Sequence, residues 1–468
     1  MIPKNKMYLT SQDFSQWSDS FAELINSDKR YEKLSCGDCD ICNSSCFSNK
    51  SIESNIRTKN ITFVVTERCN FSCKYCYETH KTGRRMTKKV AKQAVDFLFD
   101  EQKINGYYKF DDSVAVILEF IGGEPLLEIE LIDYIVEYFK FKAFEVGSPW
   151  ASNYMISMSS NGYTFEIDER VQNFIKRNLG RVSIGITIDG NKELHDKCRV
   201  LNDGITGTYD VVESSVKAWL KINPSAQTKI TLAPENVMFL NDAIKNVWNL
   251  GLTCAFTNCV FEEGWKTSDA TVLYHQMIEL ADYLLEDNRY SKYFCSLFDE
   301  SIGEELKDDK NWCGGTGEML AIAPDGKCFP CIRFMRYSLN GRKEQPIGDI
   351  FKGLDKKENN AWLKELNQIT MSSQCSYEDN KKCLTCPIAS GCALCSGYNY
   401  DHFGTPNHKA TYICETHQSR VMASAYFFNK LYKKLGLENK FELNISKEWA
   451  LKIITKEEYN NLIILGGE

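Results

Sequence analysis

The 468-residue sequence has no apolar run that approaches the ~18 residues a membrane-spanning helix needs, and the run Val114–Leu118 is soon broken by Glu119. Its first residues, Met1–Lys6, lack the apolar core of a secretory signal. Positive charge is not in excess either, because 56 Lys and Arg stand against 63 Asp and Glu, a net charge of −7. That balance argues against broad binding to nucleic acid or anionic membranes. We therefore expect a cytoplasmic protein whose partners include neither nucleic acid nor membrane.

Cysteine is the residue type that the sequence has in excess. The 20 cysteines fall in clusters rather than being spread along the chain. Because a reducing cytoplasm does not maintain disulfides, clustered thiols without a secretory signal indicate metal ligands.

A regular alternation of strands and helices begins near Asn60. The predicted strands are Ile61–Thr66, Val114–Ile121, Tyr154–Ser159, Val182–Ile188, Thr228–Ala233 and Thr253–Val260. The predicted helices are Thr87–Gln102, Ile129–Phe144, Asp168–Asn178, Tyr209–Lys221, Val237–Leu250 and Val272–Glu286. Six successive βα units predict an α/β fold with a parallel sheet and right-handed crossovers. Such a sheet either curls into a partial (β/α)6 barrel or stays open as a Rossmann-like sheet, and in both forms ligands gather at the C-terminal ends of the strands.

The periodic pattern ends near Tyr290. Ten cysteines lie between Cys295 and Cys414, and a helical segment is predicted around Ala423–Leu435. The C-terminal third therefore differs in character from the βα region that precedes it.

The first predicted strand runs directly into a loop that carries Cys69, Cys73 and Cys76 at the spacing C-x3-C-x2-C. Three thiolates on one short loop can ligate three irons of a cubane cluster, which leaves the fourth iron for a substrate or cofactor. The alternative is a tetrahedral zinc site, which prefers four ligands, with His80 as the fourth. The position favours the cluster, because βα folds carry their chemistry at the C-terminal ends of strands.

This loop resembles the C-x3-C-x-aromatic-C motif of radical S-adenosylmethionine (SAM) enzymes, with Tyr75 at the aromatic position. The second strand ends in Gly-Gly-Glu-Pro, which is similar to the GGE motif of that family. Without the resemblance, this tetrapeptide would be an ordinary loop. The resemblance implies a SAM site built from Tyr75, Gly122, Gly123, Glu124, Pro125, Ser160, Asn161, Thr187 and Arg199. In it, glycine would let the backbone approach SAM closely, and Glu124 would bear on the amino group of its methionine moiety.

The fourth strand ends in Thr-Ile-Asp-Gly, and His195 and Asp196 follow shortly after it. This stretch resembles one found in sulfatase maturases and peptide maturases, and there Asp189 is the predicted catalytic residue. A thiol or amide that loses a hydrogen must also lose a proton, which a nearby carboxylate can accept. The alternatives are a turn-forming Asp-Gly pair for Asp189 and a hydrogen-bonded cap for His195 and Asp196.

The C-terminal cysteines resemble the SPASM extension of radical SAM proteins, except that the last short spacing is x2 instead of x3. The resemblance implies two auxiliary [4Fe–4S] clusters. The first would be held by Cys313, Cys331 and Cys395, with Cys295 or Cys328 as a fourth ligand, or with a site open to a substrate thiolate. The second would be held by Cys383, Cys386, Cys392 and Cys414. A zinc ribbon is the alternative.

The remaining cysteines form two sets. Cys198, Cys254 and Cys259 lie on or near predicted core strands, and we interpret them as buried thiols. Cys375 is a further candidate for the second auxiliary set. The N-terminal cysteines have the spacing of a bacterial ferredoxin and predict a third auxiliary cluster, a zinc knuckle or free thiols: Cys36, Cys39, Cys42 and Cys46.

The expected organisation is an N-terminal cysteine-containing segment (1–58), a radical SAM partial barrel (59–289), a SPASM domain (290–420) and a helical segment (421–468). The resemblance implies reductive cleavage of SAM to a 5′-deoxyadenosyl radical, with a flavodoxin or ferredoxin-type electron donor. The expected function is maturation of a ribosomally made precursor peptide through a Cys-derived thioether crosslink. The alternatives are an anaerobic sulfatase maturase that forms formylglycine and a non-catalytic electron carrier, against which the radical SAM motifs argue.

Overall fold

The computed structural model describes residues 57–104, 113–262, 264–309, 311, 313–316, 319–356, 359–374, 383, 385–438 and 441–467. The chain forms two compact units. The first comprises the described residues up to Asn70, Tyr77–Gly185 and Gly314–Asn367, and the second comprises Phe71–Cys76, Ile186–Cys313 and the described residues from Gln368 onward. The predicted ligands Cys36, Cys39, Cys42 and Cys46 lie outside the described residues, as does Cys375.

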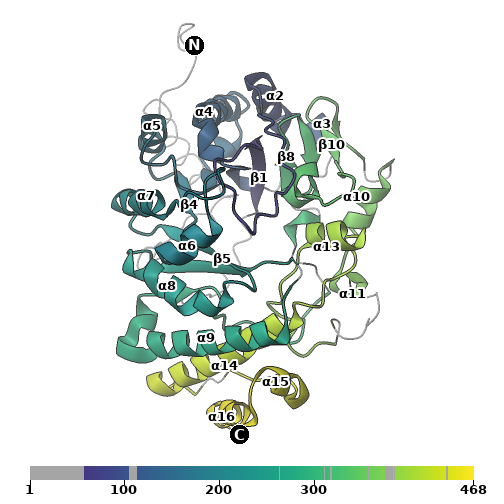
Figure 1. Ribbon diagram of the computed structural model, residues 1–468. Coiled ribbons are helices and arrows are strands. Elements are labelled where there is room, and N and C mark those ends of the chain that lie inside the picture. The colour runs from purple at the N-terminus through teal and green to yellow at the C-terminus, as the bar shows by residue number, and fades with distance from the viewer. Residues whose placement is uncertain are drawn as a thin grey trace, which may run out of the picture. The chain divides into compact units, whose positions relative to one another are not determined.

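The first unit is built on one sheet with the strand order β11-β10-β9-β8-β1-β2-β3-β4. Its strands are β1 (Arg57–Thr66), β2 (Ser113–Gly122), β3 (Tyr154–Ser160), β4 (Val182–Ile186), β8 (Met319–Ile322), β9 (Lys327–Phe329), β10 (Gly348–Asp349) and β11 (Gly353–Leu354). Strand β1 pairs in parallel with β8 (Figure 1) and, along its other edge, with β2. Ile61, Phe63 and Val64 of this strand are completely buried. A parallel strand that is covered on both faces buries successive residues in this way, instead of every second one.

The helices of the first unit are α2 (Lys88–Leu98), α3 (Glu101–Ile104), α4 (Ile129–Glu145), α5 (Glu169–Arg177) and α10 (Ala361–Leu366). Helix α2 begins at the predicted cap, because the hydroxyl of Thr87 accepts a hydrogen bond from the backbone N–H of Val90 at 3.2 Å. Its buried residues include Ala94, Phe97 and Leu98, as helical spacing predicts. Helix α4 packs between α2 and α5.

The second unit contains a three-stranded parallel sheet in the order β5-β6-β7, formed by β5 (Gln227–Leu232), β6 (Cys254–Cys259) and β7 (Phe294–Cys295). Its helices are α6 (Lys192–Cys198), α7 (Tyr209–Ile222), α8 (Leu240–Asn249), α9 (Thr267–Leu285), α11 (Met371–Gln374), α13 (Ser396–Phe403), α14 (Cys414–Leu435), α15 (Lys447–Ile453) and α16 (Lys456–Gly466). The long helices α9 and α14 lie side by side (Figure 1), and the hydroxyl of Ser419 donates to the carbonyl of Ala270 at 2.7 Å.

All six predicted strands form, as β1 to β6, which confirms the α/β prediction. Within the described residues neither sheet closes on itself, as a partial barrel requires. Strands β4 and β5 belong to different sheets, although the hydroxyl of Thr228 donates to the carbonyl of Ile186 at 2.7 Å. No helix among the described residues is long and apolar enough to cross a membrane.

Three features differ from the sequence prediction. The helix predicted at Thr87–Gln102 is two helices, α2 and α3. Helix α14 begins at Cys414, well before the predicted Ala423, so the last predicted SPASM cysteine is already helical. Strands β8 to β11 extend the sheet of β1, because a short strand that pairs with a distant one leaves no periodic signal.

Candidate functional site

The loop from Thr66 to Cys76 carries the first three predicted cysteines and is called the cysteine loop below. In the first unit its start lies against the end of β2: the N–H of Gly123 donates to the carbonyl of Thr66 at 3.0 Å, and the N–H of Glu124 donates to that of Arg68 at 2.8 Å. A Cβ atom on Gly122 would lie 2.2 Å from the Thr66 oxygen, and one on Gly123 would lie 2.3 Å from the Arg68 oxygen. Both glycines are therefore required by a backbone-to-backbone approach, independently of any ligand.

Glu124 joins the ends of β2 and β3. Its carboxylate is 1% exposed and accepts three hydrogen bonds, from the N–H of Leu126 at 3.0 Å, the hydroxyl of Ser160 at 2.7 Å and the N–H of Asn161 at 2.7 Å. The amide of Asn161 in turn lies 3.9 Å from the sulfur of Cys69. The predicted SAM-binding residues of these two strand ends thus form one network that reaches the first cysteine. Pro125 follows at the start of a short 3-10 helix, Pro125–Glu128.

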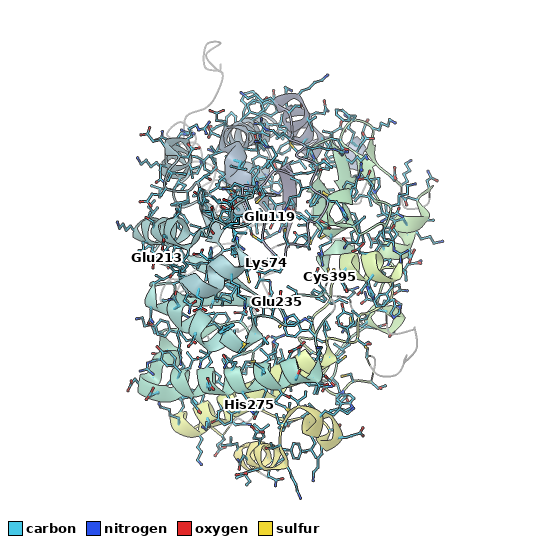
Figure 2. The ribbon with its side chains drawn as sticks, viewed as in Figure 1. Lys74, Glu119, Glu213, Glu235, His275 and Cys395 are labelled. Atoms are coloured by element: carbon cyan, nitrogen blue, oxygen red, sulfur yellow. The ribbon has the colours of Figure 1, made fainter. Side chains whose placement is uncertain are left out.

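In the second unit, the segment Phe71–Cys76 of the cysteine loop is held along the residues after α6. The N–H of Ser72 donates to the carbonyl of Val200 at 2.9 Å, and the N–H of Lys74 donates to that of Cys198 at 3.0 Å. Figure 2 labels Lys74 on this segment. Cys198 is buried, which confirms its interpretation as a core thiol.

Tyr75, Asp189 and Arg199 meet in the second unit. The hydroxyl of Tyr75 donates to the carboxylate of Asp189, and the guanidinium of Arg199 donates to the same hydroxyl at 2.8 Å. Asp189 is 1% exposed, and this burial raises the pKa of its carboxyl group, although Arg199 and Tyr75 oppose the shift. The Nε atom of Arg199 is buried without a hydrogen-bond partner among the described residues, so it is a donor available to an anion. Thr187 is half-buried just after β4.

A chain of hydrogen bonds joins the backbones of Asp189 and Arg199. The N–H of Asp189 donates to Nδ1 of His195 at 3.2 Å, so the ring hydrogen lies on Nε2, 3.1 Å from the hydroxyl of Thr208. That hydroxyl donates to the carbonyl of Arg199 at 2.9 Å. Burial, and then Arg199, lower the pKa of His195, which keeps the ring neutral. Asp196 accepts the N–H of Thr208 at 2.7 Å, which confirms its interpretation as a cap.

A second group of cysteines surrounds a cavity of about 480 Å³ in the second unit. The cysteines that line it are Cys383, Cys386, Cys392 and Cys414. Among the described residues, no three His, Cys, Asp or Glu side chains converge on one point as ligands of a single ion would. Four thiols on one cavity supply the donors that either a [4Fe–4S] cluster or a tetrahedral zinc site needs.

The three cysteines predicted for the first auxiliary cluster fall in different units: Cys331 in the first, Cys313 and Cys395 in the second. Figure 2 shows Cys395 at the N-terminal end of α13, where its sulfur accepts a backbone N–H of the first turn at 3.4 Å. Such a position stabilises a thiolate. Of the two candidate fourth ligands, Cys295 lies buried in β7 and Cys328 lies buried in β9.

Two features of the site escaped the sequence analysis. Thr208 is a single hydroxyl outside every motif, and only the fold brings it to His195. Lys409 lies in a polar stretch of sequence, yet it lines the four-cysteine cavity. Neither residue has a sequence signal that separates it from a surface residue.

Comparison with known proteins places this geometry in a family. The Radical SAM superfamily matches residues 63–235 of the chain. An uncharacterized protein of Methanocaldococcus jannaschii is 32% identical over 273 residues, which cover 58% of this chain and 84% of that protein. The chain belongs to the radical SAM superfamily. Membership implies SAM and a [4Fe–4S] cluster as cofactors, and the protein is an enzyme.

More distant relatives cover most of the chain. The subtilosin biosynthesis protein AlbA of Bacillus subtilis is 23% identical, over 74% of this chain and 69% of that protein. A serine-type anaerobic sulfatase-maturating enzyme of Bacteroides thetaiotaomicron is 22% identical, over 74% of this chain and 87% of that protein. The solved structure of anSMEcpe with bound AdoMet and the Cp18Cys peptide has a TM-score of 0.58 at 17% identity, covers 81% of this chain and 100% of that one, and shows a shared fold.

Proposed function

We propose that this radical SAM enzyme matures a ribosomally made precursor peptide by installing a Cys-derived thioether crosslink. A relative that takes part in bacteriocin biosynthesis and a structural neighbour that binds a peptide support a peptide substrate. The observation that carries the proposal is the cavity lined by four cysteines. An oxidation that starts by hydrogen abstraction must also remove an electron from the substrate, and an additional iron–sulfur cluster is suited to accept it.

The cysteine loop supplies the thiols that the proposed cluster needs. Cys69, Cys73 and Cys76 would hold the radical SAM cluster, and SAM bound there supplies a 5′-deoxyadenosyl radical that takes a hydrogen atom from a substrate carbon. The unpartnered Nε of Arg199 suits the carboxylate of SAM. The network of Glu124 fixes the end of β3 against the start of the loop, which orients the first cysteine.

Forming a thioether also breaks an S–H bond, and the chain must take up the proton that is released. We assign this role to Asp189. The carboxylate of Asp189 is buried and accepts a hydrogen bond from the hydroxyl of Tyr75. A proton therefore reaches Asp189 through that hydroxyl, which passes its own proton to the carboxylate as it takes up another. The turn interpretation accounts for Gly190, whose φ is +85°, but it does not account for the hydrogen bond between the two side chains.

Replacing Asp189 with Asn tests this role, because the amide nearly preserves the shape and removes the base. We expect SAM cleavage to persist while the ratio of crosslinked peptide to 5′-deoxyadenosine falls. The matched control is Asp203→Asn, since Asp203 is an exposed residue that caps a turn. Product formation by Asp189→Asn at the rate of the unchanged enzyme would leave Asp189 with a structural role only.

The thioether assignment rests on the sequence pattern of the first auxiliary set. That pattern predicts Cys313, Cys331 and Cys395 as ligands, with either Cys295 or Cys328 as the fourth or a position open to a substrate thiolate. The competing function is maturation of a sulfatase to formylglycine, which the sulfatase-maturating relative favours. Mass spectrometry after alkylation of free thiols separates the products. A thioether loses two hydrogens and leaves its Cys unable to react with the alkylating reagent. Formylglycine made from Cys loses the sulfur, and formylglycine made from Ser loses two hydrogens while every Cys stays reactive. A short cysteine-rich reading frame beside the gene supports the first function, and a sulfatase gene supports the second.

The electron for SAM cleavage is proposed to come from a flavodoxin or ferredoxin-type donor. The N-terminal cysteines, which lie outside the described residues, stay predicted ligands of a third auxiliary cluster or of zinc.

A further inference from the structure

Lys409 is one of the two buried lysines among the described residues. The other, Lys140, forms an ion pair with the carboxylate of Glu137 at 2.7 Å. Lys409 is 5% exposed, and its ammonium group donates to the sulfur of Cys392 at 3.2 Å. Burying an ammonium group costs free energy unless negative charge compensates it. The position of the Lys409 ammonium beside a predicted cluster ligand therefore needs a physical explanation.

The segment that carries Lys409 is fixed by hydrogen bonds. The N–H of Lys409 donates to the carbonyl of Gln374 in α11 at 3.1 Å, and the side-chain amide of Gln374 donates to the carbonyl of Pro406 at 3.1 Å. The N–H of Ala410 donates to the side chain of Asn399 in α13 at 3.3 Å. The side chain of Lys409 therefore starts from a fixed backbone and enters the cavity lined by the four cysteines.

We propose that Lys409 raises the reduction potential of the iron–sulfur cluster held in this cavity and thereby makes that cluster the electron acceptor of the oxidation step. The inference rests on the proposed function, in which the cavity holds an auxiliary cluster. Reduction adds one negative charge to a cluster, and a buried cation stabilises the reduced state more than the oxidised state. A hydrogen bond to a ligating sulfur acts in the same direction, because it withdraws charge from the cluster.

The electron balance is then complete. The carbon-centred substrate radical loses one electron as the C–S bond forms, the S–H proton goes to the base, and the cluster gains the electron. An external one-electron carrier of the flavodoxin or ferredoxin class reoxidises the cluster. A cluster of low potential would resist the first transfer, so the charge of Lys409 favours the direction that the chemistry needs.

The test is a potentiometric titration followed by electron paramagnetic resonance. The background variant has Cys69, Cys73 and Cys76 replaced by Ala, so that the remaining signals come from auxiliary clusters. In this background, Lys409→Met should lower the midpoint potential of one signal by about 59 mV or more. For one electron, this shift corresponds to a tenfold change in the equilibrium constant of reduction. Lys409→Arg keeps the charge and should stay near the original potential. Lys452→Met, which removes an exposed ammonium from the edge of the same cavity, is the control and should shift the potential far less, because water screens that charge.

If Lys409→Met keeps its full iron content and its midpoint potential is unchanged, the inference is overturned. The proposal that the cavity holds an auxiliary cluster is not affected by that result. If that variant loses iron, Lys409→Gln replaces it, because Gln keeps a donor without the charge. A midpoint for Lys409→Gln equal to that of the unchanged lysine also overturns the inference. Failure of the proposed function gives a different result: Cys383→Ser together with Cys414→Ser would leave the iron content unchanged, which would show that the cavity holds no cluster.

Discussion

Thr208 offers a sharp test of how the active site is held together. Its hydroxyl is 1% exposed, accepts from Nε2 of His195 and donates to the carbonyl of Arg199. It thus completes a chain of hydrogen bonds that runs from the backbone N–H of Asp189 through the ring of His195 to the carbonyl of Arg199. Thr208→Val replaces the hydroxyl with a methyl group of nearly the same size, so packing is retained while both hydrogen bonds are lost.

The magnitude follows from the two partners left behind. The ring N–H of His195 and the carbonyl of Arg199 would both remain buried without a partner, and each such group costs about 1–3 kcal/mol. Even the lower bound, about 2 kcal/mol for the pair, corresponds to more than a tenfold change in a local opening equilibrium. The segment that holds Asp189 and Arg199 should therefore open more often, and their side chains should hold Tyr75 less firmly.

Hydrogen exchange with mass spectrometry measures this opening directly. In Thr208→Val, amide protection in the peptides that span residues 186–210 should fall at least tenfold, and the yield of product per SAM cleaved should fall with it. Thr208→Ser keeps the hydroxyl and is the matched control, so it should retain most of the protection. Exchange in Thr208→Val as slow as in the unchanged protein would refute the idea that this chain positions the site.

Three further predictions follow from the cysteine sets and from Glu124. Anaerobically reconstituted enzyme should hold at least three [4Fe–4S] clusters, about twelve irons, and a value near four would contradict the auxiliary sites. Replacing the three cysteines of the cysteine loop with Ala should abolish 5′-deoxyadenosine formation while auxiliary iron stays bound; undiminished SAM cleavage would show that the loop is not the site. Glu124→Gln should weaken SAM binding about tenfold or more in calorimetry, because the N–H of Asn161 loses a charged acceptor worth about 1.5–3 kcal/mol. The exposed Glu130→Gln should bind SAM normally.

The strands that carry the site could be predicted from the sequence because they are buried parallel strands. Such strands appear as short apolar runs rich in β-branched residues, and the run predicted at Val114–Ile121 became β2 at Ser113–Gly122. Their C-terminal ends were equally predictable, which located the cysteine loop, the end of β2 and Asp189. The resemblance to radical SAM enzymes then supplied the chemical roles of these residues, which the spacing of the cysteines alone does not reveal.

Contacts between distant segments could not be predicted in the same way. The pairing of β8 with β1 joins Met319–Ile322 to a strand more than 250 residues earlier, and four residues carry no period. The two glycines at the end of β2 were expected to admit a ligand, whereas the structure shows that the backbone of Thr66 and Arg68 already requires them. Lys409 and Thr208 depend on tertiary placement alone, since single polar residues leave no pattern.

The position of the cysteine loop depends on two separate hydrogen-bond networks. Its first part is bonded to the ends of β2 and β3 through Glu124 and Asn161, within the first unit. Its second part is bonded to the residues around Arg199, within the second unit. The sequence presents three cysteines as one element, but two separate polar networks set their positions. A substitution in either network should therefore disturb the loop without touching a cysteine. Because both networks position the same loop, the effect of Glu124→Gln combined with Thr208→Val on product yield should depart from the sum of their separate effects.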